Sequence, residues 1–213
     1  MIRFDPSHQL LAVGVAILAG FVDAIGFVES AGFFVSFMTG NSTRLAVGLA
    51  EAQHAALVAA IIIAVFVAGV VAGSLVGAHA GRRRTPAVLL GVTILLTIAT
   101  LLRLEGEGWS AILSLALAMG VANAAIAGRD GSVIGVTYMT GTLVQMGQKI
   151  ANAVRGEGDR RWLDHLGLWA ALVGGALLGA RAVIWSPPLA YALAVALAAV
   201  LALRAGWIVR NVG

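Results

Sequence analysis

The sequence contains no cysteine, only four prolines and few charged residues. The absence of cysteine excludes disulfide bonds and thiolate metal ligands within these 213 residues. Charged residues make up 11% of the chain, whereas soluble domains have about 25%. This shortage of charge argues against a soluble fold, because a soluble domain needs charged side chains on its surface.

Apolar residues are abundant, at 60% of the chain with a mean hydropathy of +0.96. A helix of about 20 consecutive apolar residues crosses the hydrocarbon core of a bilayer, which is about 30 Å thick. Apolar runs that are uncharged, or contain Asp23 alone, occur at 10–28, 55–78, 85–102, 108–128 and 182–203. The sequence therefore predicts an all-α polytopic membrane protein.

Two further apolar segments are interrupted by polar residues. The stretch FFVSFMTGNSTRLAVGLA begins at Phe33 and has six polar or small residues, 39–44, at its centre. About a hundred residues later, VIGVTYMTGTLVQMGQ repeats the arrangement at 140–142. Irregular backbone at membrane depth is tolerated only where it is buried in protein or lines a cavity. We therefore expect each segment to be a re-entrant or broken helix, with 31–38 and 43–50 as helical arms around the first bend.

The chain also contains an internal repeat, with three pairs of similar blocks in the same order. The pairs are AILAGFVDAI (16–25) with ALAMGVANAA (116–125), MTGN (38–41) with MTGT (139–142), and GSLVGAHAG (73–81) with GALLGARAV (175–183). The offsets are 100, 101 and 102 residues, which is unlikely by chance. We predict one membrane domain made of two repeats, 1–104 and 105–213.

The distribution of basic residues predicts the number of crossings. Lys and Arg accumulate in cytoplasmic loops. If the two interrupted segments dip in and return, six crossings remain, namely 10–28, 55–79, 86–103, 108–128, 162–183 and 187–208. With the N-terminus inside, 11 of the 14 basic residues then lie at the cytoplasmic face, and Arg44, Arg103 and Arg181 are the exceptions. Eight crossings would split the basic clusters between the two sides. Three crossings per half make the halves inverted repeats, a plan common in transporters.

Asp23 and Arg44 are the charged residues that the predicted membrane segments place deepest. A charge within the bilayer is costly and points to a function. Asp23 is interpreted as a protonatable coupling residue, a cation ligand or an ion-pair partner of Arg44, and these alternatives stay open. Its counterpart in the second half is the uncharged Asn123, and that of Arg44 is Gln145.

The predicted binding site joins the two polar segments near the middle of the membrane. Its residues are Asp23, Thr39, Gly40, Asn41, Arg44, Asn123, Thr140, Gly141, Thr142 and Gln145. The alternative is that the threonines only cap and hydrogen-bond helices. We expect no catalytic residues, no metal and no cofactor, since no known catalytic motif occurs. No nucleic-acid partner is expected despite the sequence pI of about 10.6, because no basic soluble domain is present.

Several stretches of the sequence resemble a known family. GFVDAIGF, FMTGNSTRLAVGLA, GVANAAI and TYMTGTLVQMGQKIANA are similar to segments of the YoaK-like family of bacterial inner-membrane proteins, whose function is unknown. The resemblance covers nearly the whole chain. It implies a small integral membrane protein with signature positions Asp23, Thr39, Gly40, Asn41, Thr140, Gly141 and Thr142, and it implies no particular substrate.

The function that we predict is transport of a small polar or anionic solute, as a permease or exporter coupled to protons through Asp23. Two alternatives remain, a passive channel and a membrane scaffold or intramembrane enzyme. The expected location is the bacterial inner membrane, with both termini cytoplasmic. A homo-oligomer formed through the glycine-rich helix faces is a further expectation, because small residues let membrane helices approach closely.

Overall fold

The computed structural model describes residues 6–52, 54–125, 139–157 and 162–212, which are helical apart from short connections. The helices are α1 (Pro6–Glu29), α2 (Met38–Ala50), α3 (Ala55–Ala80), the 3₁₀ turn η1 (Gly81–Arg83), α4 (Arg84–Leu104), α5 (Gly108–Ala122), α6 (Met139–Val154), α7 (Trp162–Trp185) and α8 (Pro187–Val212). No strand occurs among the described residues. The predicted all-helical class is therefore confirmed for this part of the chain.

Four described stretches are long and apolar enough to cross a membrane, namely Leu10–Glu29, Ala55–Leu104, Trp162–Trp185 and Pro187–Asn211. The second has 50 residues and contains both α3 and α4. These helices separate at Gly81, whose φ of 53° lies in the left-handed region that glycine adopts without strain. The predicted crossing 108–128 is represented by α5, with 15 residues. Residues 123–125 form turns after the helix, and 126–128 lie outside the described residues.

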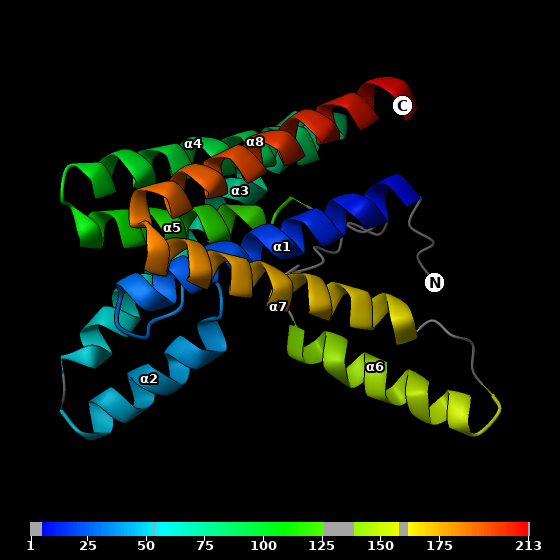
Figure 1. The fold of residues 1–213 in the computed structure, drawn as a ribbon, viewed down its shortest axis with the longest axis horizontal. Coiled ribbons are helices and arrows are strands. Elements are labelled where there is room, and N and C mark those ends of the chain that lie inside the picture. Colours follow the sequence, from blue (N-terminus) through cyan, green and yellow to red (C-terminus); the bar gives the residue numbers. More distant parts are fainter. Residues whose placement is uncertain (1–5, 53, 126–138, 158–161, 213) are drawn as a thin grey trace.

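Six of the helices form the body of the molecule. In Figure 1, α4 and α8 lie along the top, α1, α3 and α5 lie in the middle, and α7 crosses α1. The first residues of α1 and the last residues of α8 lie at the same end (Figure 1). α5 provides much of the core, since ten of its 15 residues are buried. Because α5 is apolar on every side, burial by several neighbours suits it.

Two helix pairs cross at very short distance, and glycine makes both crossings possible. A Cβ added to Gly20 of α1 would lie 2.1 Å from the carbonyl oxygen of Leu172 in α7. A Cβ added to Gly120 of α5 would lie 2.1 Å from the carbonyl oxygen of Phe66 in α3. Side chains at either glycine would push the backbones apart, so small residues set the packing here as in many membrane helix pairs.

The partner helices contribute glycines to the same crossings. Added Cβ atoms on Gly175 and Gly179 of α7 would meet the carbonyl oxygens of Ile17 and Phe21 at 2.2 and 2.3 Å. On α3, Gly69 and Gly73 face the carbonyl oxygens of Leu117 and Val121 at 2.3 and 2.8 Å. The glycine stripes thus pack within the chain. Assembly of copies through glycine-rich faces stays a prediction.

The two short helices lie on one side of this body. α2 has 13 residues and packs on α3, and α6 has 16 residues and packs on α7. Figure 1 shows both below α1 and α7, with their first turns toward the middle of the molecule and their last turns toward opposite ends. α2 and α6 do not contact each other.

The internal structure of the first polar segment differs from the prediction. Residues 31–37 are turns and irregular backbone, not a helical arm, and the TGNS residues lie in the first turns of α2 instead of at a bend. The chain reverses earlier, where Ala31 and Gly32 have φ angles of 57° and 111°. The residue that precedes α2 is Phe37, and no side chain caps the first turn of the helix.

Candidate functional site

The irregular segment between α1 and α2 is held by side chains that satisfy its backbone. Ser30 Oγ accepts a hydrogen bond from the Phe33 N–H and donates one to the Phe33 carbonyl, both at 2.9 Å. Because Ser30 and Phe33 are buried, their polar groups need partners within the protein. The next three residues, Phe34 to Ser36, are held by Asn41 and Asp23.

Asn41 binds both polar backbone groups of one residue. Its Oδ1 accepts from the Phe34 N–H at 3.0 Å, and its Nδ2 donates to the Phe34 carbonyl at 2.6 Å. The side chain is fully buried. An amide supplies one acceptor and two donors, which suits this pair of bonds. Asn41 therefore fixes the path of the irregular segment against the first turn of α2.

Asp23 of α1 holds the backbone of the next two residues of the irregular segment. Its Oδ1 accepts hydrogen bonds from the N–H groups of Val35, at 2.8 Å, and Ser36, at 2.7 Å. Hydrogen bonds to a carboxylate are shorter and stronger than those between neutral groups. Asp23 forms no ion pair with Arg44 in the described structure. Among the interpretations left open, these contacts favour a structural role for Asp23, and proton coupling stays a prediction.

Gly40 lies beneath an aromatic cluster of Phe27, Phe34 and Phe37. The ring centroids of Phe34 lie 4.9 Å from Phe27 and 5.2 Å from Phe37. An added Cβ on Gly40 would lie 2.7 Å from Phe37 and 2.9 Å from Phe34. A side chain at this position would have to displace two rings, so glycine suits the packing here, and it provides no bend in the backbone.

The hydroxyl groups of α2 are partly used within the helix. Ser42 Oγ donates to the Met38 carbonyl at 2.9 Å, and Thr43 Oγ1 donates to the Thr39 carbonyl at 3.2 Å. Both side chains and that of Thr39 are exposed. A hydroxyl bonded to the preceding turn is compatible with a lipid-facing surface, because its donor is satisfied.

Arg44 is partly exposed and has no acidic partner. Its guanidinium carbon lies 5.1 Å from the centroid of the Phe33 ring, a cation–π arrangement. Gly32 leaves the space that the guanidinium occupies, because an added Cβ would lie 2.8 Å from an Arg44 nitrogen. No carboxylate of the described residues lies within 4.0 Å of its nitrogens.

The predicted residues of the second half lie on α5 and α6. Asn123 follows the last turn of α5, and its Nδ2 donates to the Met119 carbonyl at 2.8 Å. Thr140, Gly141 and Thr142 occupy the first turn of α6, and Gln145 follows one turn later. The lead-in that would correspond to the irregular segment of the first half, 126–138, lies outside the described residues.

The described structure brings together only some of the predicted site residues. Asp23 and Asn41 converge on the irregular segment, and Arg44 reaches its start. The helices that carry the two motifs make no contact, and the described pocket beside Arg44 includes no residue of α6. A joint site of the two motifs therefore remains a prediction.

A polar stripe along α6 was only partly recognised from the sequence. Gln145, Gln148 and Asn152 recur three and four residues apart, so they share one helix face. All three are exposed, and none makes a hydrogen bond in the described structure. The spacing of amides was the available signal, and Gln145 alone was placed in the predicted site.

A charged cluster at the far end of α1 was missed by the sequence analysis. Glu29 of α1 and Arg103 of α4 form a salt bridge. Tyr191 of α8 interacts electrostatically with both, and its buried hydroxyl has no hydrogen-bond partner in the described structure. The signal was present, because Glu29 and Arg103 end two predicted spans on the same side of the membrane. This cluster ties three helices together.

The described residues contain no group of three or more His, Cys, Asp or Glu side chains able to hold a metal ion. The side chains within reach of the irregular segment supply a carboxylate, a guanidinium, hydroxyls and amides, beside its own backbone groups. These groups bind and position polar molecules.

Long apolar helices around a braced irregular segment define a polytopic helical membrane protein. Residues 11–205 match the family described as Protein of unknown function (DUF1275), and the chain belongs to this family. A UPF0700 transmembrane protein of Rhizobium meliloti (strain 1021) is 40% identical over 195 residues, which is 88% of this chain and 84% of the relative. The predicted membership of a membrane protein family of unknown function is confirmed. No solved structure matches the chain.

Proposed function

We propose that this protein transports a small polar solute across the bacterial inner membrane. The observation that carries the proposal is the stripe of amides on α6, which is exposed and without hydrogen bonds. α6 packs on α7, a helix long and apolar enough to span the membrane. Gln145 lies nine residues before the end of α6, about 14 Å along the helix. That distance is about half of the hydrocarbon thickness.

An amide at that depth needs a partner, because an unsatisfied polar group in hydrocarbon is costly. The hydroxyls of Ser42 and Thr43 on α2 donate within their own helix, whereas the amides on α6 bond to nothing in the described chain. We infer that α6 faces water and lines the solute pathway. A membrane scaffold, the alternative, would instead seal the stripe against another protein surface.

The inverted-repeat plan belongs to the same proposal, and the glycine contacts support it. Gly20 meets Leu172 and Ala176, and Gly120 meets Phe66 and Val70. The two sets of contacts correspond residue by residue. The α5 residue lies 100 positions after its α1 counterpart, and the α7 residues lie 106 positions after their α3 counterparts. The similar sequence blocks in α3 and α7 are 102 residues apart, so the contacts are shifted by about one helical turn relative to that alignment. Equivalent crossings in both halves are expected of transporters built from repeats.

Labelling of introduced cysteines tests the orientation and the pathway together, since the chain has no cysteine. With the N-terminus cytoplasmic, Arg83→Cys should react with a membrane-impermeant maleimide only from the cytoplasmic side. Gln148→Cys should also react from that side, because water reaches α6. Leu143→Cys, exposed on the opposite face of α6, is the matched control and should react poorly in lipid. Labelling of Arg83→Cys from outside would refute the orientation, and an unreactive Gln148→Cys would favour the scaffold.

Solute flux in proteoliposomes tests transport itself. We expect the double change Gln145→Leu and Gln148→Leu to lower the flux about tenfold or more, since each lost hydrogen bond is worth about 1 kcal/mol. Leu143→Val, on the opposite face of α6, should leave the flux unchanged. The probes are glycerol, followed by light scattering, and radiolabelled propionate. Acceleration by a pH gradient would distinguish a proton-coupled permease from a passive channel, and no flux above protein-free vesicles would contradict transport.

A further inference from the structure

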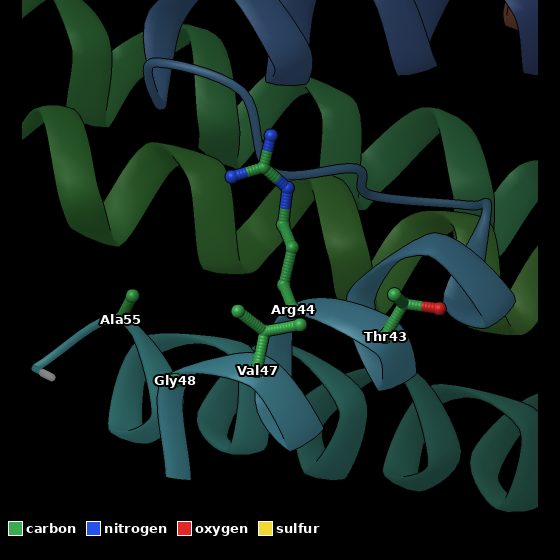
Figure 2. A pocket seen from close by; sticks show the side chains of 5 residues that line it. All are labelled: Thr43, Arg44, Val47, Gly48 and Ala55. Atoms are coloured by element: carbon green, nitrogen blue, oxygen red, sulfur yellow. The ribbon is translucent and has the colours of Figure 1, made fainter. Parts of the chain in front are cut away.

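The pocket beside Arg44 combines one cation with apolar walls. It has a volume of about 180 Å³ and is lined by Thr43, Arg44, Val47, Gly48 and Ala55. Figure 2 shows the Arg44 side chain rising from α2 toward the segment that joins α1 and α2. Pockets for drug-sized ligands have about 300–1,000 Å³. The size therefore suits a small solute.

The guanidinium is positioned but not neutralised. Its stacking on Phe33 and the space at Gly32 restrict where it lies, and no described carboxylate pairs with it. A positive charge in a region of apolar helices is unfavourable without a counter-charge. Thr43 donates its hydroxyl to its own helix, so its donor does not serve a ligand in this arrangement. The pocket therefore presents a cation with no counter-charge among the described residues.

We infer that Arg44 binds the carboxylate of a small organic anion, which defines the solute class of the transporter proposed above and rests on that proposal. A planar guanidinium binds a carboxylate through two parallel hydrogen bonds. Val47 and Ala55 provide an apolar surface for a short hydrocarbon body. Inorganic phosphate, which lacks an apolar body and presents more oxygens than one guanidinium can satisfy, fits this lining less well.

Binding is tested with the full chain in nanodiscs of zwitterionic lipid, with propionate as the probe in saturation-transfer NMR. Arg44→Gln should weaken propionate binding at least about tenfold, because it removes the charge and the two parallel hydrogen bonds to the carboxylate. Arg44→Lys should retain part of the affinity, since it keeps the charge and loses the planar fork. Arg155→Gln is the matched control and should bind normally, because Arg155 is exposed and paired with Glu157.

Further binding measurements distinguish the possible ligands of this pocket. Inorganic phosphate should bind more weakly than propionate, and tetramethylammonium should not compete. Nanodiscs rich in phosphatidylglycerol should leave propionate binding unchanged. Loss of binding there would assign the pocket to lipid headgroups and overturn the inference, as would unchanged binding in Arg44→Gln. Glycerol flux without propionate binding would refute this inference alone, whereas propionate binding without any flux would refute transport.

Discussion

Asp23→Ala should strongly destabilise the protein. The substitution leaves the N–H groups of Val35 and Ser36 without their acceptor, and each unsatisfied buried group costs about 1–3 kcal/mol. We expect a lower thermal unfolding midpoint in detergent and a smaller monodisperse fraction in size-exclusion chromatography. Both changes should occur with no solute present, because they arise from the unpaired backbone N–H groups of the irregular segment. An unchanged unfolding midpoint would refute the structural role of Asp23.

Asp23→Asn separates the structural role from proton coupling. Asparagine keeps one oxygen that can accept from both N–H groups, so the protein should fold with a smaller loss of stability than the alanine variant. If Asp23 also couples protons, flux driven by a pH gradient should disappear in Asp23→Asn while downhill flux continues. Equal loss of both fluxes in a folded variant would exclude a specific coupling role.

Gly175→Ala should be almost as damaging, whereas its neighbour should tolerate the same change. A Cβ on Gly175 would lie 2.2 Å from the Ile17 carbonyl oxygen, so α1 and α7 must separate. Such overpacking typically costs about 1–3 kcal/mol. Gly174→Ala places its methyl group in open space on the same helix and should leave stability unchanged or slightly improved.

Unfolding in a mixed-micelle denaturant titration measures both variants under the same conditions. Gly120→Ala tests the equivalent crossing of α5 with α3, where an added Cβ would lie 2.1 Å from the Phe66 carbonyl oxygen. A loss similar to that of Gly175→Ala is expected. Equal stabilities of Gly174→Ala and Gly175→Ala would show that the backbones relax freely at the crossing, contrary to the packing described above.

The membrane class could be predicted from sequence because its physical basis is local. A run of about 20 apolar residues satisfies its own backbone as a helix and needs no distant partner. The runs starting near Leu10, Ala55 and Trp162 accordingly became long helices. The turn between α3 and α4 was also predictable in outline, because an arginine cluster interrupts the apolar sequence.

The structure of the first polar segment could not be predicted from such local properties. The apolar residues before the polar centre favoured a helical arm over 31–38, since nothing local requires these residues to be irregular. Tertiary contacts decided otherwise, because Asp23 and Asn41 satisfy the free backbone groups from 12 and seven residues away. The same contacts favour a positioning role for both residues, and their predicted roles in solute binding and proton coupling stay predictions.

The sequence by itself determined that this chain is an all-helical membrane protein, that its polar residues gather at two related places, and which residues are unusual for a bilayer. Only the tertiary structure decided what those residues touch. Asp23 accepts hydrogen bonds from backbone N–H groups, and Gly40 packs against aromatic rings. Arg44, in contrast, has no described counter-ion, and the α6 amides have no described hydrogen-bond partner. The reason is physical: hydrophobicity and helix length act along the chain, whereas satisfaction of a polar group depends on neighbours that folding brings from elsewhere.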